Sequence, residues 1–166
     1  MTPSWDLFIM LFFIALTAYG FLLQRDKAVV TMISIYVALV ITAILTDPIQ
    51  GFFAGEKAIM NQIFIRSSAN SFTIQTAIFL TIIGLVSAKS GIEGRDSGGS
   101  VIETFGFSFL NASLVVSSIL FFMEPGKRET IVASSKLARI LVNYQVWWIV
   151  LPVALLIITG FMRKNN

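Results

Sequence analysis

Five long apolar runs, separated by short polar stretches, dominate the chain. They cover residues 7–23, 28–45, 72–88, 101–123 and 144–162, and within them only Glu103 is charged. A helix needs roughly 20 apolar residues to cross a bilayer, with about 17 to 25 tolerated. The pattern therefore predicts an all-α fold, a polytopic bundle of about five transmembrane helices forming a single membrane domain over residues 1–166.

The first two runs are joined by four polar residues, 24–27, which predicts a tight helical hairpin across the membrane. Asp47 and Pro48 follow the second run, and we expect them to end its helix, because proline resists helix continuation. The first six residues contain no Lys or Arg, so the first run is interpreted as a retained anchor rather than a signal peptide.

Two mixed stretches favour amphipathic helices lying along the membrane surface. In residues 49–66 the apolar positions recur at spacings of three, four or seven. Residues 129–143 place one set of apolar side chains on one side and polar ones on the other; the apolar set is Ala133, Leu137, Ile140 and Tyr144, and the polar set is Lys136, Arg139 and Asn143. The prediction is one or two interfacial helices.

The amino-acid composition limits the kinds of chemistry that the protein can carry out. Hydrophobic residues make up 56% of the chain and charged residues 13%, against about 25% charged in soluble domains, so the protein is integral to a membrane. The absence of Cys and His excludes disulfides, thiol chemistry, histidine metal sites and Ser-His-Asp triads. We expect no catalytic residues, no metal and no cofactor. The net charge of +3 is scattered and argues against a nucleic-acid partner.

The distribution of Lys and Arg does not indicate which way the bundle is oriented in the membrane. Lys and Arg in loops favour the cytoplasmic face, but with the N-terminus outside the two faces hold six each. The cytoplasmic set would be Arg25, Lys27, Lys89, Arg95, Arg163 and Lys164, and the external set Lys57, Arg66, Lys127, Arg128, Lys136 and Arg139.

Charged residues near the spans are the first places to look for transport chemistry, because an ion buried in a membrane is costly. Asp6, Asp47 and Glu103 all lie at predicted helix ends. We interpret them as end-marking charges, which argues against a proton- or sodium-coupled pump. Arg25 and Lys27 could bind an anionic headgroup, but two bases in a turn are interpreted as a solvated pair.

The fourth run carries a polar stripe at helical spacing. Its members are Thr104, Ser108, Asn111 and Ser118. Such residues either hydrogen-bond neighbouring helices or line a pore. The small residues Ala112, Ser113 and Ser117 beside the stripe favour helix packing, because they allow helices to approach closely.

A Gly- and Ser-rich loop precedes the stripe. It lacks the Gly-Lys-Ser/Thr ending of a phosphate-binding loop. The residues Ser90-Gly91-Ile92-Glu93-Gly94-Arg95-Asp96, followed by Phe105-Gly106 and Ile119-Leu120-Phe121-Phe122, resemble the colicin V production (CvpA) family. Asp6 before the first span and Gly20-Phe21 before a basic turn are similar to the family's order.

The chain also departs from the family pattern. The Arg that usually follows the loop Asp is Ser97, the Arg-Gly pair of the fourth span is Leu110-Asn111, and the Arg-Gly of the first turn is Tyr19-Gly20. A fifth span follows where many members have a polar tail. We therefore carry over Gly91, Gly94 and Asp96 alone, as a candidate shaped loop in which glycines permit a turn and Asp caps the next helix.

The resemblance implies a multi-pass bacterial inner-membrane protein with its N-terminus outside. It also implies a non-enzymatic, permease-like or helper role in toxin production or export and in envelope homeostasis. A second hypothesis is a structural subunit of a larger respiratory or secretion complex. A third is a channel formed by the stripe. The expected partners are the lipid bilayer and either further copies of the chain or other membrane proteins.

Overall fold

The computed structural model describes residues 4–53, 70–90 and 100–164, and within these ranges every regular element is a helix. The helices are α1 (Trp5–Leu22), α2 (Gln24–Phe53), α3 (Ser71–Lys89), α4 (Val101–Phe122), α5 (Pro125–Ser134), α6 (Lys136–Asn143) and α7 (Gln145–Lys164). The all-α membrane fold is confirmed: four helices are long and apolar enough to span a bilayer, or five if α6 and α7 form one bent span.

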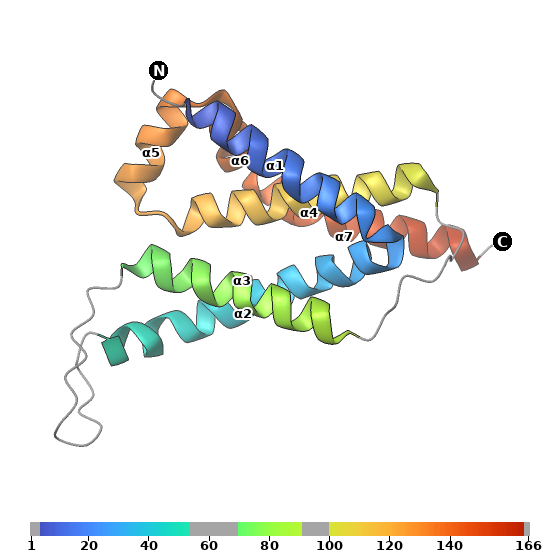
Figure 1. The fold of residues 1–166 in the computed structure, drawn as a ribbon, viewed down its shortest axis with the longest axis horizontal. Coiled ribbons are helices and arrows are strands. Elements are labelled where there is room, and N and C mark those ends of the chain that lie inside the picture. Colours follow the sequence, from blue (N-terminus) through green and yellow to red (C-terminus); the bar gives the residue numbers. More distant parts are fainter. Residues whose placement is uncertain (1–3, 54–69, 91–99, 165–166) are drawn as a thin grey trace.

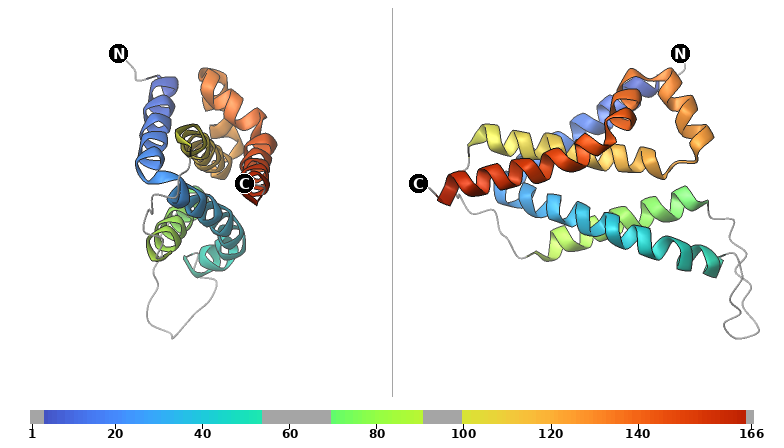
Figure 2. Two further views of the ribbon diagram at one scale, coloured as in Figure 1. Left: turned by 90° about the vertical axis from the view of Figure 1, so that its right-hand side faces the viewer. Right: turned by 180° about the vertical axis from the view of Figure 1, so that it is seen from behind.

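Helix α4 forms the centre of the bundle. It contacts α1, α2, α3, α6 and α7, and twelve of its residues are buried. Helices α2 and α3 pack along one another on one side of α4, while α1 and α7 flank α4 on opposite sides of it (Figures 1 and 2). Because α4 is surrounded by protein, polar side chains on it face other helices rather than lipid.

The spans predicted at residues 7–23, 72–88, 101–123 and 144–162 agree with α1, α3, α4 and α7 to within two residues at each end. The prediction that Asp47 and Pro48 end the second span is wrong, since α2 continues to Phe53. Proline removes only its own N–H from the helix, and membrane helices tolerate that loss where side chains compensate. Just before it, the Thr46 hydroxyl donates to the Thr42 carbonyl at 2.6 Å.

This correction also changes the amphipathic helix predicted for residues 49–66. Its first residues, 49–53, are the end of α2, and residues 54–66 lie outside the described part of the chain.

The second amphipathic prediction, 129–143, is wrong in its continuity. Ser135 adopts an extended conformation (φ −130°, ψ 125°) and separates α5 from α6. This break changes the phase of the helix. The apolar residues buried against the core are Ile131, Ala138 and Leu141, whereas Ala133, Ile140 and Tyr144 of the predicted apolar side are exposed and Leu137 is half-buried.

The bundle has two distinct ends. The α1–α2 turn, the last residues of α3 and the first residues of α4 lie at one end, and α5, α6 and the start of α1 lie at the other (Figure 1). Helices α6 and α7 meet at an angle of 67°. A core cluster of Ile9, Val116, Leu120, Ile131, Ala138 and Leu141 holds α5 and α6 against α1 and α4.

Candidate functional site: the polar seam of α4

Thr104, Ser108, Asn111 and Ser118, which we call the α4 seam, are all buried inside the bundle. Their side chains belong to the face of α4 that is covered by other helices. The stripe found in the sequence is therefore an internal feature of the folded chain, as the packing interpretation expects, and does not lie on its outer surface.

Asn111 makes the contact between helices that the packing interpretation requires. Its Nδ2 donates to the backbone carbonyl of Ala28, in the first turns of α2, at 2.8 Å. Ala28 is itself 1% exposed, so this bond lies where no solvent competes for it. The other amide atom, Oδ1, is buried and has no hydrogen-bond partner among the described residues.

The hydroxyl groups of the seam are satisfied within α4. Ser108 donates to the carbonyl of Thr104 at 2.8 Å, and Ser118 donates to the carbonyl of Leu114 at 2.6 Å. Thr104 makes a longer bond of 3.4 Å to the carbonyl of Ser100. A hydroxyl bonded to its own helix needs no water, so these side chains fit a dry interface between helices.

The seam also includes a close contact between α1 and α4. A Cβ added to Gly20 would lie 3.0 Å from both Cβ and Oγ of Ser108 and 3.4 Å from its Cα. A side chain at position 20 would require Ser108 to shift. This is the close approach that small residues give transmembrane helices, and Gly20 and Ser108 provide it jointly.

An ion pair closes one end of the seam. Nε of Arg25, in the α1–α2 turn, lies 2.7 Å from Oε2 of Glu103, in the first turn of α4, with side-chain exposures of 13% and 32%. The guanidinium also lies 6.0 Å from the centre of the Phe107 ring. The interpretation of Arg25 as part of a solvated pair is therefore wrong, because its charge is used to hold the hairpin against α4.

The turn that presents Arg25 has an unusual backbone. Gln24 has φ 66° and is the only non-glycine residue with positive φ in the described part of the chain. A side chain in this region costs of order 1 kcal/mol or more and needs support from its surroundings. The Arg25–Glu103 pair, one residue further on, supplies a fixed point for the turn.

The remaining candidate residues differ in their exposure and their contacts. Asp47 is exposed but lies within α2 rather than at its end, so its interpretation as an end-marking charge is wrong, and Lys27 is half-buried. Asp6 has a specific role that its position in the sequence did not indicate: its Oδ1 accepts from the Ser135 hydroxyl at 2.6 Å and from the Leu137 N–H at 3.1 Å. The loop residues Gly91, Gly94 and Asp96 lie outside the described residues.

Sequence reasoning missed the Arg25–Glu103 pair although it held one signal for it. Glu103 is the only charged residue within the five apolar runs, and a carboxylate there requires either water or a base. Nothing in the sequence alone selects Arg25 over the other bases near that end of the bundle, because the choice depends on where α4 crosses the hairpin.

The chemical capacity of the site follows from these contacts. Arg25 and Glu103 neutralise each other, the hydroxyls are bonded to their own helix, and no three acidic side chains gather as a metal site in the part of the chain that the structure describes. Comparison with protein-family models, with curated proteins and with solved structures finds no match to the chain. The resemblance to the CvpA family therefore stays a prediction.

Proposed function

We propose that the chain is a non-enzymatic component of a bacterial inner membrane that acts in toxin or bacteriocin production or export and in envelope homeostasis, as its resemblance to the CvpA family implies. The observation that supports a non-enzymatic role is that Asn111 of the α4 seam and the charged pair beside the seam contact groups of the chain itself. Arg25 pairs with Glu103, and Asn111 binds the Ala28 carbonyl. Such groups fix helices in place rather than turn over a substrate.

A permease-like role would require a polar group that can meet a solute inside the bundle. Within the seam, the Oδ1 of Asn111 is the buried side-chain atom without a partner. The bond from its Nδ2 to Ala28 nevertheless places Asn111 at a packed helix crossing, which favours the helper role over the permease role.

The direct test is deletion of the gene, followed by measurement of bacteriocin release and of sensitivity to envelope stress. We expect at least one of the two to change, and expression of the intact chain from a plasmid to restore it. Unchanged values for both would refute the proposal. A complementing copy carrying Asn111→Leu separates the two roles, because a permease would lose transport while a helper that retains its fold would still complement.

A structural subunit of a larger membrane complex is the second candidate. It is favoured by the outer helices, which leave most of their surface free: α1 buries only Ile9 and α3 only Ile74 and Phe79. Purification in a mild detergent distinguishes the two readings. Recovery of other membrane proteins in fixed ratio would support the subunit role, and recovery of the 18.3 kDa chain alone or as a homo-oligomer would count against it.

A substitution at Gly84 lets the same purification locate the surface that binds a partner. No atom lies within 4 Å of a Cβ added there, so Gly84→Leu leaves the chain's own packing intact while enlarging the outer face of α3. Loss of co-purifying protein in this variant, but not in a matched Ala43→Leu variant on the exposed side of α2, would place the partner on α3.

The proposed orientation, with the N-terminus outside, comes from the resemblance alone. The start of α1 and the α5–α6 segment lie at the same end of the bundle (Figure 1). An impermeant thiol reagent applied to intact cells should therefore label Glu124→Cys, at the start of α5, if this end is outside. Labelling only after the inner membrane is opened would reverse the orientation.

A further inference from the structure

We propose that Lys136 and Arg139, on the outward face of α6, form a binding site for the headgroup of an anionic phospholipid. This inference goes beyond the proposed function and requires only that the bundle lies in a membrane. It rests on four properties of the α5–α6 end: the direction in which the two side chains project, the partners of the neighbouring charges, the aromatic residues beside them, and the firm anchoring of α6.

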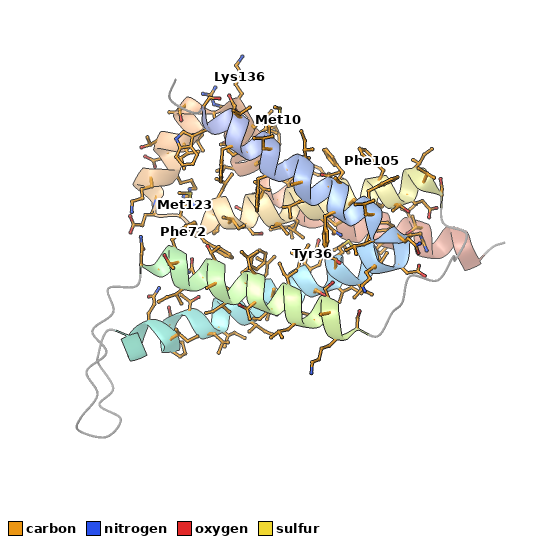
Figure 3. All side chains as sticks on the ribbon, viewed as in Figure 1. Met10, Tyr36, Phe72, Phe105, Met123 and Lys136 are labelled. Carbon is orange, nitrogen blue, oxygen red and sulfur yellow. The ribbon has the colours of Figure 1, made fainter. Side chains whose placement is uncertain are left out.

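Both side chains point away from the protein. Lys136 and Arg139 are exposed, and they lie three residues apart, which places them one turn apart on one side of the helix. Figure 3 shows the Lys136 side chain projecting outward from the bundle beyond α1. The opposite side of α6, with Ala138 and Leu141, is buried against the core.

The other bases of this end are already engaged. Lys127 lies 3.0 Å from Glu124. Arg128 donates to the carbonyl of Phe121 at 3.5 Å and lies 5.1 Å from the centre of the Phe121 ring. In the described residues neither Lys136 nor Arg139 has an ion pair of this kind.

Acidic neighbours offset the charge of the two bases only in part. Helix α6 itself contains no Asp or Glu. Asp6 lies near enough to Lys136 to interact with it electrostatically, and the hydrogen bonds that its Oδ1 accepts from the Ser135 hydroxyl and the Leu137 N–H favour its charged form, so it offsets part of the charge of Lys136. Glu129 is exposed one helix away, on α5. The outward face of α6 therefore keeps two cationic groups that an anion can approach from the solvent side.

Exposed aromatic rings mark the depth of this end in the bilayer. Tyr144 and Trp147 follow Arg139 at the α6–α7 junction and are 55% and 59% exposed, and Trp5 at the start of α1 is 44% exposed. Tyr and Trp collect at the membrane–water interface, at the level of the headgroups. Bases beside such rings lie at the depth of lipid phosphates, where an arginine can bind two phosphate oxygens at once.

The site is held firmly enough to be selective. The Ser135 hydroxyl is donated to Asp6, and its oxygen accepts from the Ala138 N–H at 3.0 Å, so the first turn of α6 is capped and tied to α1. Helix α6 therefore presents Lys136 and Arg139 in one arrangement, which a diffuse basic tail would not do.

The three Trp residues of the chain supply the assay. Trp5, Trp147 and Trp148 all lie at this end, so a brominated lipid bound there quenches their fluorescence. The full chain is reconstituted into phosphatidylcholine vesicles that contain a minor share of phosphatidylglycerol, and bromine is placed on one lipid or the other. We expect quenching per mole of lipid to be roughly tenfold stronger for phosphatidylglycerol, the order that two interfacial bases can produce.

The variant Lys136→Gln with Arg139→Gln should abolish this preference, and added salt should weaken it. The matched control, Lys27→Gln with Lys89→Gln at the opposite end, removes the same charge and should leave it intact. Circular dichroism verifies folding, and the single variant Arg139→Lys should keep part of the preference. Equal quenching by both lipids in the unaltered chain would overturn the proposal, as would an equal loss of preference in the control variant.

Discussion

The two ends of the bundle use the same kinds of residue in opposite ways. At the end formed by the α1–α2 turn, Arg25 is nearly buried, pairs with Glu103 and fixes a hairpin to the central helix. At the α5–α6 end, Lys136 and Arg139 project from a helix whose other face is packed. The difference arises from the neighbouring carboxylate: Glu103 pairs directly with Arg25, whereas Asp6 accepts hydrogen bonds from Ser135 and Leu137 and leaves the side chains of Lys136 and Arg139 exposed.

The largest effect should come from breaking the pair. We expect Glu103→Ala to lower the free energy of unfolding by about 2 kcal/mol. This is below the roughly 3–5 kcal/mol typical of a fully buried pair, because Glu103 is 32% exposed. Titration with a denaturing detergent in mixed micelles measures it. Lys136→Ala, the control at the other end, should change stability by less than about 0.5 kcal/mol.

The same pair can be tested for coupling. In a double-mutant cycle, Arg25→Ala and Glu103→Ala should be strongly non-additive, because each removes the same interaction. Additive effects would mean that the 2.7 Å approach contributes nothing to stability, and that the hairpin is held by other contacts.

The next effect distinguishes two glycines. Gly20→Ala places a methyl group 3.0 Å from Ser108, and overpacking of this kind costs about 1–3 kcal/mol. Gly84→Ala meets no atom within 4 Å and should be neutral or stabilising by up to about 1 kcal/mol, since alanine favours helix. Equal effects of the two substitutions would contradict the close crossing of α1 and α4.

A smaller loss is expected at Asn111. Hydrogen bonds between membrane helices contribute about 0.6 kcal/mol on average and up to about 1.7 kcal/mol. Asn111→Ala should therefore reduce stability by roughly 1 kcal/mol, because it removes the bond to the Ala28 carbonyl. Ser118→Ala is the matched control: its hydroxyl bonds only to its own helix, and its loss should be smaller.

The smallest effect on overall stability is expected for substitution of Asp6, and it should be detected locally, in α6. Asp6→Ala removes the acceptor for Ser135 and for the Leu137 N–H, so amide hydrogen exchange should accelerate in α6 while α3 stays unchanged. Asp6→Asn keeps an oxygen acceptor and should accelerate exchange less. If exchange in α6 stayed as slow in both variants as in the unaltered chain, α6 would be held by its apolar face alone.

Sequence patterning predicted the long helices because a span needs little beyond sustained apolarity. It failed where one residue acts through its surroundings. Pro48 was expected to stop α2, but the helix continues through it to Phe53, as membrane helices can. The break at Ser135 has a weak local signal, since serine favours the N-cap position, and its contact with Asp6 joins residues 129 positions apart.

For the candidate site too, the sequence pattern predicted the position of the residues along the helix but not their partners. Helical spacing placed the α4 seam on one face, and the structure shows that face buried. Neither the acceptor of Asn111 nor the partner of Glu103 could be predicted, because both belong to the hairpin at Arg25 and Ala28. Their contact with α4 depends on the angle and height of a helix crossing, which one-dimensional spacing does not encode.

The central claim is that the seam faces protein rather than a water-filled path, and cysteine labelling tests it most directly because the chain has no native Cys. Asn111→Cys, and the more conservative Ser108→Cys, are treated with a membrane-impermeant maleimide in opened membrane vesicles, with exposed Glu124→Cys as the reference. We expect position 124 to react, and positions 108 and 111 to react only after denaturation. Labelling of position 111 or 108 in the native membrane at a rate close to that of position 124 would contradict the claim.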